Sequence, residues 1–155
     1  MADTIREQII KDFVTRAETM SVANGYNYEY ADNVIRARVA IDPTEIPAVV
    51  ILPQQETVSR KYGYHEHVMP VRVEGMVEPG EDDDSVAAEK VMGDLIKCFS
   101  APDWSMSPDY MDDIGYTEGG TGGYPEVDES IVGAFIVLTV KYTTVIGDPT
   151  SQEAT

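Results

Sequence analysis

The chain has 155 residues, 43% of them hydrophobic and 25% charged, which is enough apolar material for the core of one domain. Acidic residues outnumber Lys and Arg by 28 to 11, and the formal net charge is −17 at pH 7. This balance argues against a protein that grips nucleic-acid phosphates or an anionic membrane, because both tasks need a surplus of Lys and Arg.

The first predicted element is an amphipathic helix. Apolar residues recur at helical spacing from Ile5 to Met20, and Thr4 and Glu7 have the spacing of a capping box at the start. Asn24-Gly25 is a natural stop signal. We therefore expect one helix before residue 24, with a solvated charged face.

Two strands are expected next. Ile35, Ala37, Val39 and Ile41 alternate with other residues and share one side of a candidate strand over 35–41. The following apolar run, 48–52, lies between two prolines. A short, wholly apolar run of this kind predicts a strand that is buried on both faces.

A long hairpin or extended arm is expected around residues 54–66. A polar stretch leads from Gln54 to Gly63 into an alternating run that extends to Val77. In this run His65 and His67 share one side with the apolar residues that follow. The alternation predicts a strand, and the polar stretch before it predicts the turn of a hairpin.

The second half of the chain begins with an acidic turn at 78–85 that leads into a helix ending before Pro102. A long strand over 131–146 is apolar on both faces, which is typical of a central strand. We expect one domain over residues 1–149 and a loose tail at 150–155. The predicted fold class is α+β: a mixed, mostly antiparallel sheet with two helices on one face and an extended hairpin arm.

The glycine run 119–123 lies in the most acidic part of the chain. It lacks the lysine and the following helix of a phosphate-binding loop, so we expect a flexible turn or an adaptable contact loop. Cys98, the only cysteine, cannot form an internal disulfide, and its apolar neighbours predict a buried structural thiol. Without a signal core or a membrane-length apolar stretch, the sequence predicts a soluble, unsecreted protein.

Candidate chemical sites are few. His65 and His67 could form a metal pair, but two histidines are too few for a closed zinc site and no nearby cysteine completes it. The run Asp82–Asp84 lacks the spacing of a calcium loop, and helix capping explains it better. No nucleophile and base occur in a recognisable pattern. We therefore expect no metal, no cofactor and no catalysis.

The acidic excess is unevenly placed. Residues 1–61 hold seven basic and nine acidic residues, a net charge of −2, whereas residues 62–155 hold four and nineteen, a net charge of −15. At least one surface should therefore be strongly negative.

The order of several segments carries a resemblance to a known family. These segments are Ile5–Lys11, Asn33–Arg38, Pro47–Pro53, the charged arm Glu56–Lys61, Gly93–Lys97, Val140–Tyr142 and Ile146–Pro149. Together they span nearly the whole chain from Thr4 to Pro149, and in this order they resemble the tail terminator family of long-tailed bacteriophages, also called tail completion or minor tail protein U-like proteins.

The resemblance implies an α+β virion protein of the tail or neck, assembled in the cytoplasm of the host bacterium. Such a protein forms a hexameric ring on the last ring of the tail tube, ends tube growth and offers a docking surface to the head–tail connector protein. Its partners are therefore further copies of itself, the tail tube protein and the connector, and DNA passes through the ring without being held.

Two groups of residues are candidates for these contacts. We expect scattered bases to pair across subunits with carboxylates of 78–84 or 103–129, the alternative being a solvated arm. The candidate interface residues are Arg36, Arg38, Arg60, Lys61, His65, His67 and Arg72. The candidate acidic face, which in a ring could line the bore, comprises Glu78, Glu81, Asp82, Asp83 and Asp84.

Other functions fit the sequence less well. A head-closure or connector protein of the phage neck would have a similar size and charge. An acidic DNA mimic that inhibits a host nucleic-acid-binding protein would suit the net charge, but the bases before residue 62 and the long apolar final strand suit it poorly. A small enzyme is the weakest alternative.

Overall fold

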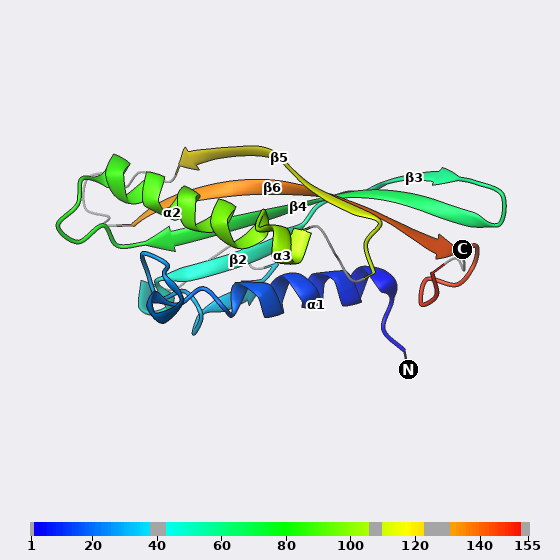
Figure 1. The fold of residues 1–155 in the computed structure, drawn as a ribbon, viewed down its shortest axis with the longest axis horizontal. Coiled ribbons are helices and arrows are strands. Elements are labelled where there is room, and N and C mark those ends of the chain that lie inside the picture. Colours follow the sequence, from blue (N-terminus) through cyan, green and yellow to red (C-terminus); the bar gives the residue numbers. More distant parts are fainter. Residues whose placement is uncertain (1, 38–42, 106–109, 123–130, 153–155) are drawn as a thin grey trace.

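The computed structural model describes residues 2–37, 43–105, 110–122 and 131–152 (Figure 1). The helical elements are α1 (Ile5–Ala17), η1 (Val22–Asn24), η2 (Pro43–Glu45), α2 (Asp84–Phe99) and α3 (Pro102–Ser105). The strands are β1 (Val34–Arg36), β2 (Ala48–Pro53), β3 (Thr57–Arg60), β4 (Tyr64–Val77), β5 (Asp113–Gly122) and β6 (Val132–Val145).

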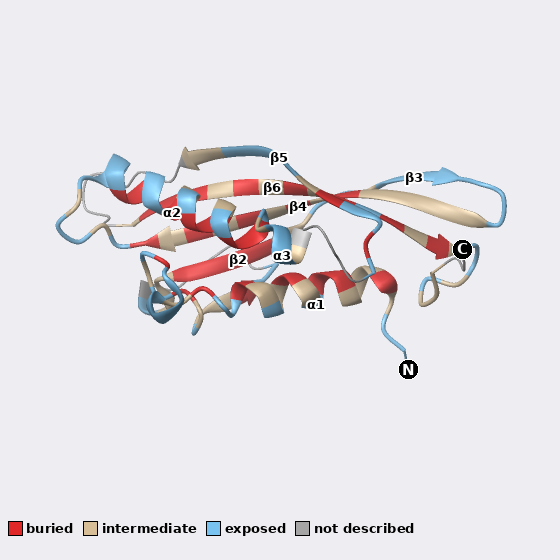
Figure 2. Ribbon diagram, in the orientation of Figure 1, coloured by how far each residue is buried: buried red, intermediate tan, exposed pale blue. Residues whose placement is uncertain are grey.

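The strands form one mixed sheet in the order β1-β2-β4-β6-β5, and β3 also pairs with β4. Only β1 and β2 are parallel; the other pairs are antiparallel. The helices α1 and α2 pack on the same face, where their apolar residues form one core with alternate residues of β2, β4 and β6 (Figure 2). The predicted α+β class, with two helices on one face of a mostly antiparallel sheet, is thus confirmed.

Helix α1 begins as predicted but ends earlier. The Thr4 hydroxyl accepts a hydrogen bond of 3.0 Å from the Glu7 backbone N–H, so Thr4 is the N-cap. The helix ends at Ala17, seven residues before the expected stop. Beyond the helix, the Met20 carbonyl accepts hydrogen bonds from the backbone N–H groups of Tyr30 and Ala31.

The first predicted strand is much shorter than expected. Strand β1 covers only Val34–Arg36, because Ala37 has a φ of 50° and thereby leaves the extended conformation. Residues 38–42, which include Val39 and Ile41, lie outside the described residues. The second prediction holds: β2 packs Val49 and Ile51 into the main core and Val50 into a small cluster on the other face.

The prediction of a glycine turn is wrong for residues 119–122. These residues belong to β5, which pairs with β6 as far as Gly122; Gly123 lies outside the described residues. A Cβ on Gly119 would lie 2.5 Å from the Tyr116 hydroxyl and 2.9 Å from the Met92 Cε. Gly119 thus lies in a strand under the ends of the Tyr116 and Met92 side chains, rather than in a turn.

The strand predicted over 131–146 is β6, and it is central because β4 and β5 flank it. After it, the chain turns back on itself. The Val145 N–H donates to the Ser151 carbonyl, and the side chain of Asp148 accepts hydrogen bonds from Thr150 and Ser151. Residues 150–152 of the expected loose tail are thus hydrogen-bonded to the body of the protein, and 153–155 lie outside the described part.

Candidate assembly interface

The predicted hairpin arm is present. Strand β3 pairs with the first part of β4, and all four residues of β3 are exposed (Figures 1 and 2). The turn at the tip is closed by a hydrogen bond from the Lys61 N–H to the Tyr64 carbonyl, and Gly63 takes the left-handed conformation with a φ of 86°. Between them, the Tyr62 side chain is fully exposed.

Strands β2 and β3 lie end to end along the same edge of β4. Pro53 is opposite Val71 and Thr57 is opposite Val68, so three residues of one strand face two of the other, which defines a β-bulge. Without the extra residue, the alternation of β2 would direct Gln55 toward the helix side. The bulge shifts the alternation by one position and directs Glu56 there instead.

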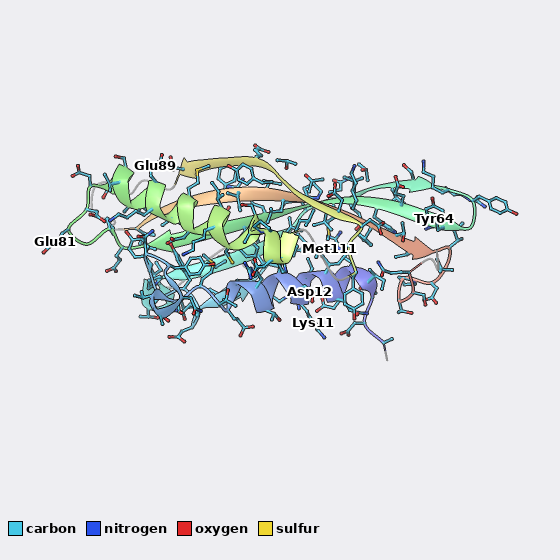
Figure 3. All side chains as sticks on the ribbon, viewed as in Figure 1. Lys11, Asp12, Tyr64, Glu81, Glu89 and Met111 are labelled. Carbon is cyan, nitrogen blue, oxygen red and sulfur yellow. The ribbon has the colours of Figure 1, made fainter. Side chains whose placement is uncertain are left out.

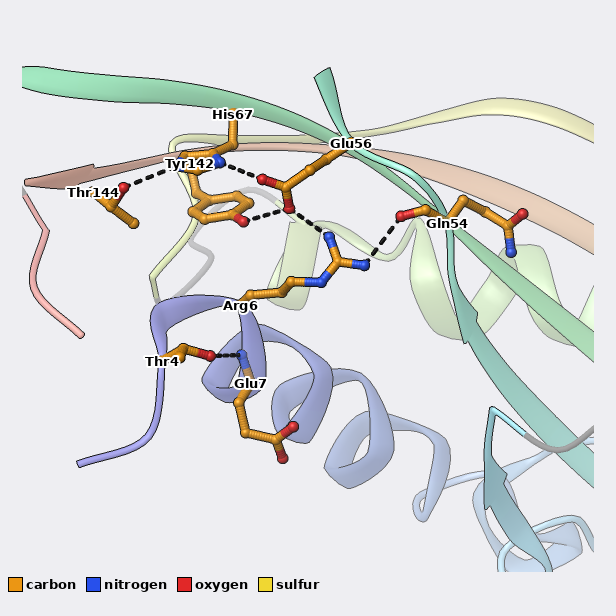
Figure 4. A network of polar contacts seen from close by, with 8 residues as sticks. All are labelled: Thr4, Arg6, Glu7, Gln54, Glu56, His67, Tyr142 and Thr144. Carbon is orange, nitrogen blue, oxygen red and sulfur yellow. Dashed lines mark hydrogen bonds and ion pairs between the residues drawn. The ribbon is translucent and has the colours of Figure 1, made fainter. Parts of the chain in front are cut away.

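The Glu56 carboxylate is the centre of a polar network at the base of the arm (Figure 4). It pairs with the Arg6 guanidinium and with Nδ1 of His67, and it accepts a hydrogen bond of 2.7 Å from the Tyr142 hydroxyl. His67 Nε2 lies 2.8 Å from the Thr144 hydroxyl. The network therefore joins α1, the bulge, β4 and β6.

The electrostatics of this network follow from its geometry. Burial acts to raise the pKa of Glu56, but hydrogen bonds from Tyr142, His67 and Arg6 together outweigh it and hold the pKa below its ordinary value. The pKa of Tyr142 is raised, first by burial and then by its hydrogen bond to Glu56. His67 also stacks on the Tyr142 ring, at 4.3 Å between ring centroids. These contacts favour an ionised Glu56 and a neutral Tyr142.

The network borders a cavity of about 460 Å³ between the start of α1, the base of the arm and Pro149. Its lining includes Thr4, Gln54 and Gln55 besides the five side chains of the network. Because the polar atoms of the network bond mainly to one another, the arrangement is suited to fix the arm on the body rather than to activate a substrate.

The candidate basic residues lie in several separate places. Arg36 makes two hydrogen bonds of 2.7 Å with Glu7 of α1. The Arg72 Nε donates to Glu74 at 2.5 Å, and its guanidinium lies 3.8 Å from the centre of the Phe135 ring. His67 belongs to the Glu56 network, with the His65 ring 6.2 Å away. Arg38 lies outside the described residues.

Two candidate bases remain at the tip of the arm. Arg60 is the last residue of β3 and Lys61 is the first of the turn, and both are exposed. Among the described residues, no carboxylate forms an ion pair with either of them. The tip thus carries two uncompensated positive charges beside the exposed Tyr62 ring.

The candidate acidic residues lie together at the other end of the molecule. Figure 3 shows Glu81 at the end opposite the arm, on which Tyr64 is labelled. Glu78, Glu81, Asp83 and Asp84 are exposed and have no ion-pair partner within the described part of the chain. Asp82 differs, because the Lys90 ammonium donates to it at 2.8 Å. Asp83 holds the N-cap position of α2 without a side-chain capping bond.

The other acidic segment, 103–129, is described only in part. Asp103 pairs with Arg16 within the chain, at 3.1 Å. Residues 106–109 and 123–130 lie outside the described residues. Within one chain, the bases of the arm tip and the carboxylates of 78–84 lie at opposite ends of the molecule (Figure 3).

The sequence analysis did not predict that one face of the sheet has no described helix over it. On this face β4 and β6 contribute half-buried residues, including Arg72, Glu74, Met76, Phe135 and Val137. Near the acidic end it contains a cavity of about 200 Å³. A signal was present: in the run 131–146 the residues that alternate with the core side are also largely apolar.

Other features and the comparisons with known proteins add little. Within the described ranges, no group of three or more His, Cys, Asp or Glu side chains could hold a metal ion. No helix there has both the length and the apolar character to cross a bilayer. No known protein-family profile matches the chain, and no curated protein matches it either.

Proposed function

We propose that the chain is a structural virion protein that caps the tail tube of a long-tailed phage as a ring. In this role it ends tube polymerisation and presents a surface to the head connector. The observation that carries the proposal is the polarity of the molecule: an exposed basic arm tip at one end and unpaired carboxylates at the other.

Two different surfaces at opposite ends are what a head-to-tail contact requires. Such a contact repeats from copy to copy and closes into a ring when the rotation between neighbours permits it. A symmetric dimer of two antiparallel copies would also pair opposite ends, but that contact stops at two copies and forms no ring. The α+β fold expected from the family resemblance also agrees with this proposal.

The net charge of −17 supports the second part of the role. A ring through which DNA passes must not bind the phosphates, and an acidic ring repels them. DNA therefore moves past the protein as a neighbour rather than as a ligand.

The test is the mass of the purified protein in solution, with and without purified tail tubes. We expect a species of about six times the 17.1-kDa chain, or binding confined to tube ends as seen by electron microscopy. A protein that stays monomeric under both conditions and leaves tube ends free would contradict the proposal. If that monomer instead competed with DNA for a nuclease, it would support the DNA-mimic alternative.

A further inference from the structure

The cavity on the open sheet face is suited to bind an aromatic side chain. Its lining includes Met76, Ile131 and Phe135, together with the backbone at Gly75 and Gly133. Arg72 lines one side of it, with the guanidinium carbon 3.8 Å from the centre of the Phe135 ring and the Nε donating to Glu74. Arg72 remains 37% exposed, so an incoming ring could stack on it.

The arm tip carries a side chain of this kind. Tyr62 is 100% exposed, whereas most of the other tyrosines that the structure describes are at least partly buried. Arg60 and Lys61 precede it directly. Tyrosine and arginine are among the residue types that most often dominate the energy of protein–protein contacts, and the fully exposed Tyr62 ring buries no surface against its own chain.

The surroundings of the cavity match the charges of the tip. The cavity lies where β4 ends, and the chain continues from there into the segment with Glu78 and Glu81. The tip and the cavity cannot meet within one chain. Tyr64 and Glu74 are ten residues apart on the same strand, a distance of about 33 Å at roughly 3.3 Å per residue. The occupant must therefore come from another molecule.

We propose that Tyr62 of one copy inserts into this cavity of the next copy, and that its Arg60 and Lys61 pair with the neighbour's acidic segment. The occupant is a second copy because the same chain provides both the aromatic, basic tip and the apolar cavity with its acidic border. This contact rests on the proposed ring and specifies its subunit interface. It also assigns the carboxylates near Glu81 to the subunit contact instead of the bore.

Cysteine cross-linking tests the contact directly. In the Tyr62→Cys/Ile131→Cys double variant, mild oxidation of the assembled protein should produce a ladder of covalent multimers that ends at the size of the ring. Tyr62→Cys alone and Ile131→Cys alone are the matched controls, and each can give no more than a dimer. Native Cys98 is buried and is present in all three proteins. A double variant that still self-associates but yields only monomers, or only the dimers of the controls, overturns the contact. Loss of self-association in the double variant and in Tyr62→Cys, but not in Ile131→Cys, supports it, because the Tyr62 ring is the proposed anchor.

Charge exchange provides a second test that does not depend on disulfides. Lys61→Glu should weaken self-association about tenfold or more, and adding Glu81→Lys should restore most of it. Lys11→Glu is the matched control, because it makes the same charge change on an exposed residue of α1 and should leave association unchanged. Equal effects of Lys61→Glu and Lys11→Glu, or no recovery in the double variant, would contradict the contact.

The two proposals can fail separately. If the wild-type protein forms rings and the assembled double variant does not form the 62–131 cross-link, the contact is overturned. The tail-terminator proposal then remains intact. A wild-type protein that remains monomeric even with tail tubes present would overturn both.

Discussion

The two ends of the strand pair β4–β6 are held by different forces. In the body, which we define as α1, α2 and the sheet beneath them, β4 and β6 place Met69, Val73, Ile136 and Leu138 in an apolar core that is almost fully dehydrated. In the arm, defined as residues 56–68 with the part of β6 that pairs with them, most side chains are exposed or half-buried, and only Tyr142 and Thr144 are buried. There the hydrogen-bonded ladder and one polar network replace the core.

The buried carboxylate of Asp94 in the body and the half-buried carboxylate of Glu56 in the arm behave in opposite ways. Burial raises the pKa of Asp94 in the body, although the Tyr30 hydroxyl at 2.9 Å and both donors of Asn27 favour its ionised form. Hydrogen bonds lower the pKa of Glu56 in the arm, where a cation is among the donors. For Asp94, burial outweighs the hydrogen bonds and the nearby Lys97 charge, whereas for the less buried Glu56 the hydrogen bonds from Tyr142, His67 and Arg6 outweigh burial.

The largest expected effect is in the body. Phe99 is fully buried and stacks on Phe13 at 5.6 Å between ring centroids. Phe99→Ala should lower the free energy of unfolding by about 3–5 kcal/mol, measured by urea denaturation, because it leaves a cavity in the core. Val58→Ala is the control in the exposed strand β3 and should change stability by about 0.5 kcal/mol or less. Similar losses in both variants would contradict the division into body and arm.

A smaller effect is expected at the base of the arm. Glu56→Ala should cost about 2 kcal/mol in urea denaturation at neutral pH, because the buried Tyr142 hydroxyl loses its acceptor and the half-exposed Arg6 loses its ion pair. Hydrogen exchange should rise most in β3. Glu66→Ala removes a carboxylate from the other face of the same arm, and we expect almost no change there. If exchange rises equally in α2 and in β3, the network does not act locally.

The cap of α1 should contribute less again. Thr4→Ala removes the acceptor for the Glu7 N–H and should cost about 1 kcal/mol in thermal or urea unfolding. Thr4→Ser keeps a hydroxyl at the same place and should recover most of the loss. A serine variant as unstable as the alanine variant would show that the side-chain cap is not the cause.

The smallest expected effect is a difference in pH dependence. The raised pKa of Asp94 means that the folded state keeps a proton that the unfolded chain has released, so this group's contribution to stability falls as pH rises toward the folded pKa. The lowered pKa of Glu56 has the opposite sign: its contribution is present above the ordinary pKa and is lost as pH falls toward the folded one.

Two isosteric variants separate these contributions. The measurement is the free energy of unfolding in urea between about pH 3 and 6. In Asp94→Asn, this free energy should lack the part of its fall that accompanies rising pH. In Glu56→Gln, it should lack part of its fall on acidification. If the slope of unfolding free energy against pH changes in the same direction in both variants, the assigned causes are wrong.

The alternation of apolar residues was enough to predict most of the sheet. It placed β2, β4 and β6 correctly because their side chains face a core, and burial leaves a strong periodic signal. It failed at Ala37, where a left-handed backbone ends the strand, since the sequence shows no turn residue there. The glycine-turn interpretation failed at 119–122, where pairing with β6 holds the chain in a strand despite the usual preference of glycine for turns.

The polar network was beyond local pattern reasoning. Arg6, Glu56, His67 and Tyr142 are far apart in the sequence, and only the strand register and the bulge bring them together. A one-residue change in register would have moved Glu56 to the opposite face. By contrast, the exposed bases of the tip and the carboxylates at 78–84 could be identified as candidates, because hairpin tips and helix starts are surface positions whatever the tertiary fold.

The uninterrupted pairing of β4 with β6 has a mechanical consequence. All fourteen residues of β4 are paired with β6, from Tyr64 at the tip to Val77 beside the acidic segment. A tension applied between the two ends of the molecule acts along these strands and loads their hydrogen bonds in shear, so many bonds share the load instead of opening one after another. In a ring held at tip and cavity, the same two strands would form a continuous tension-bearing hoop through the subunits.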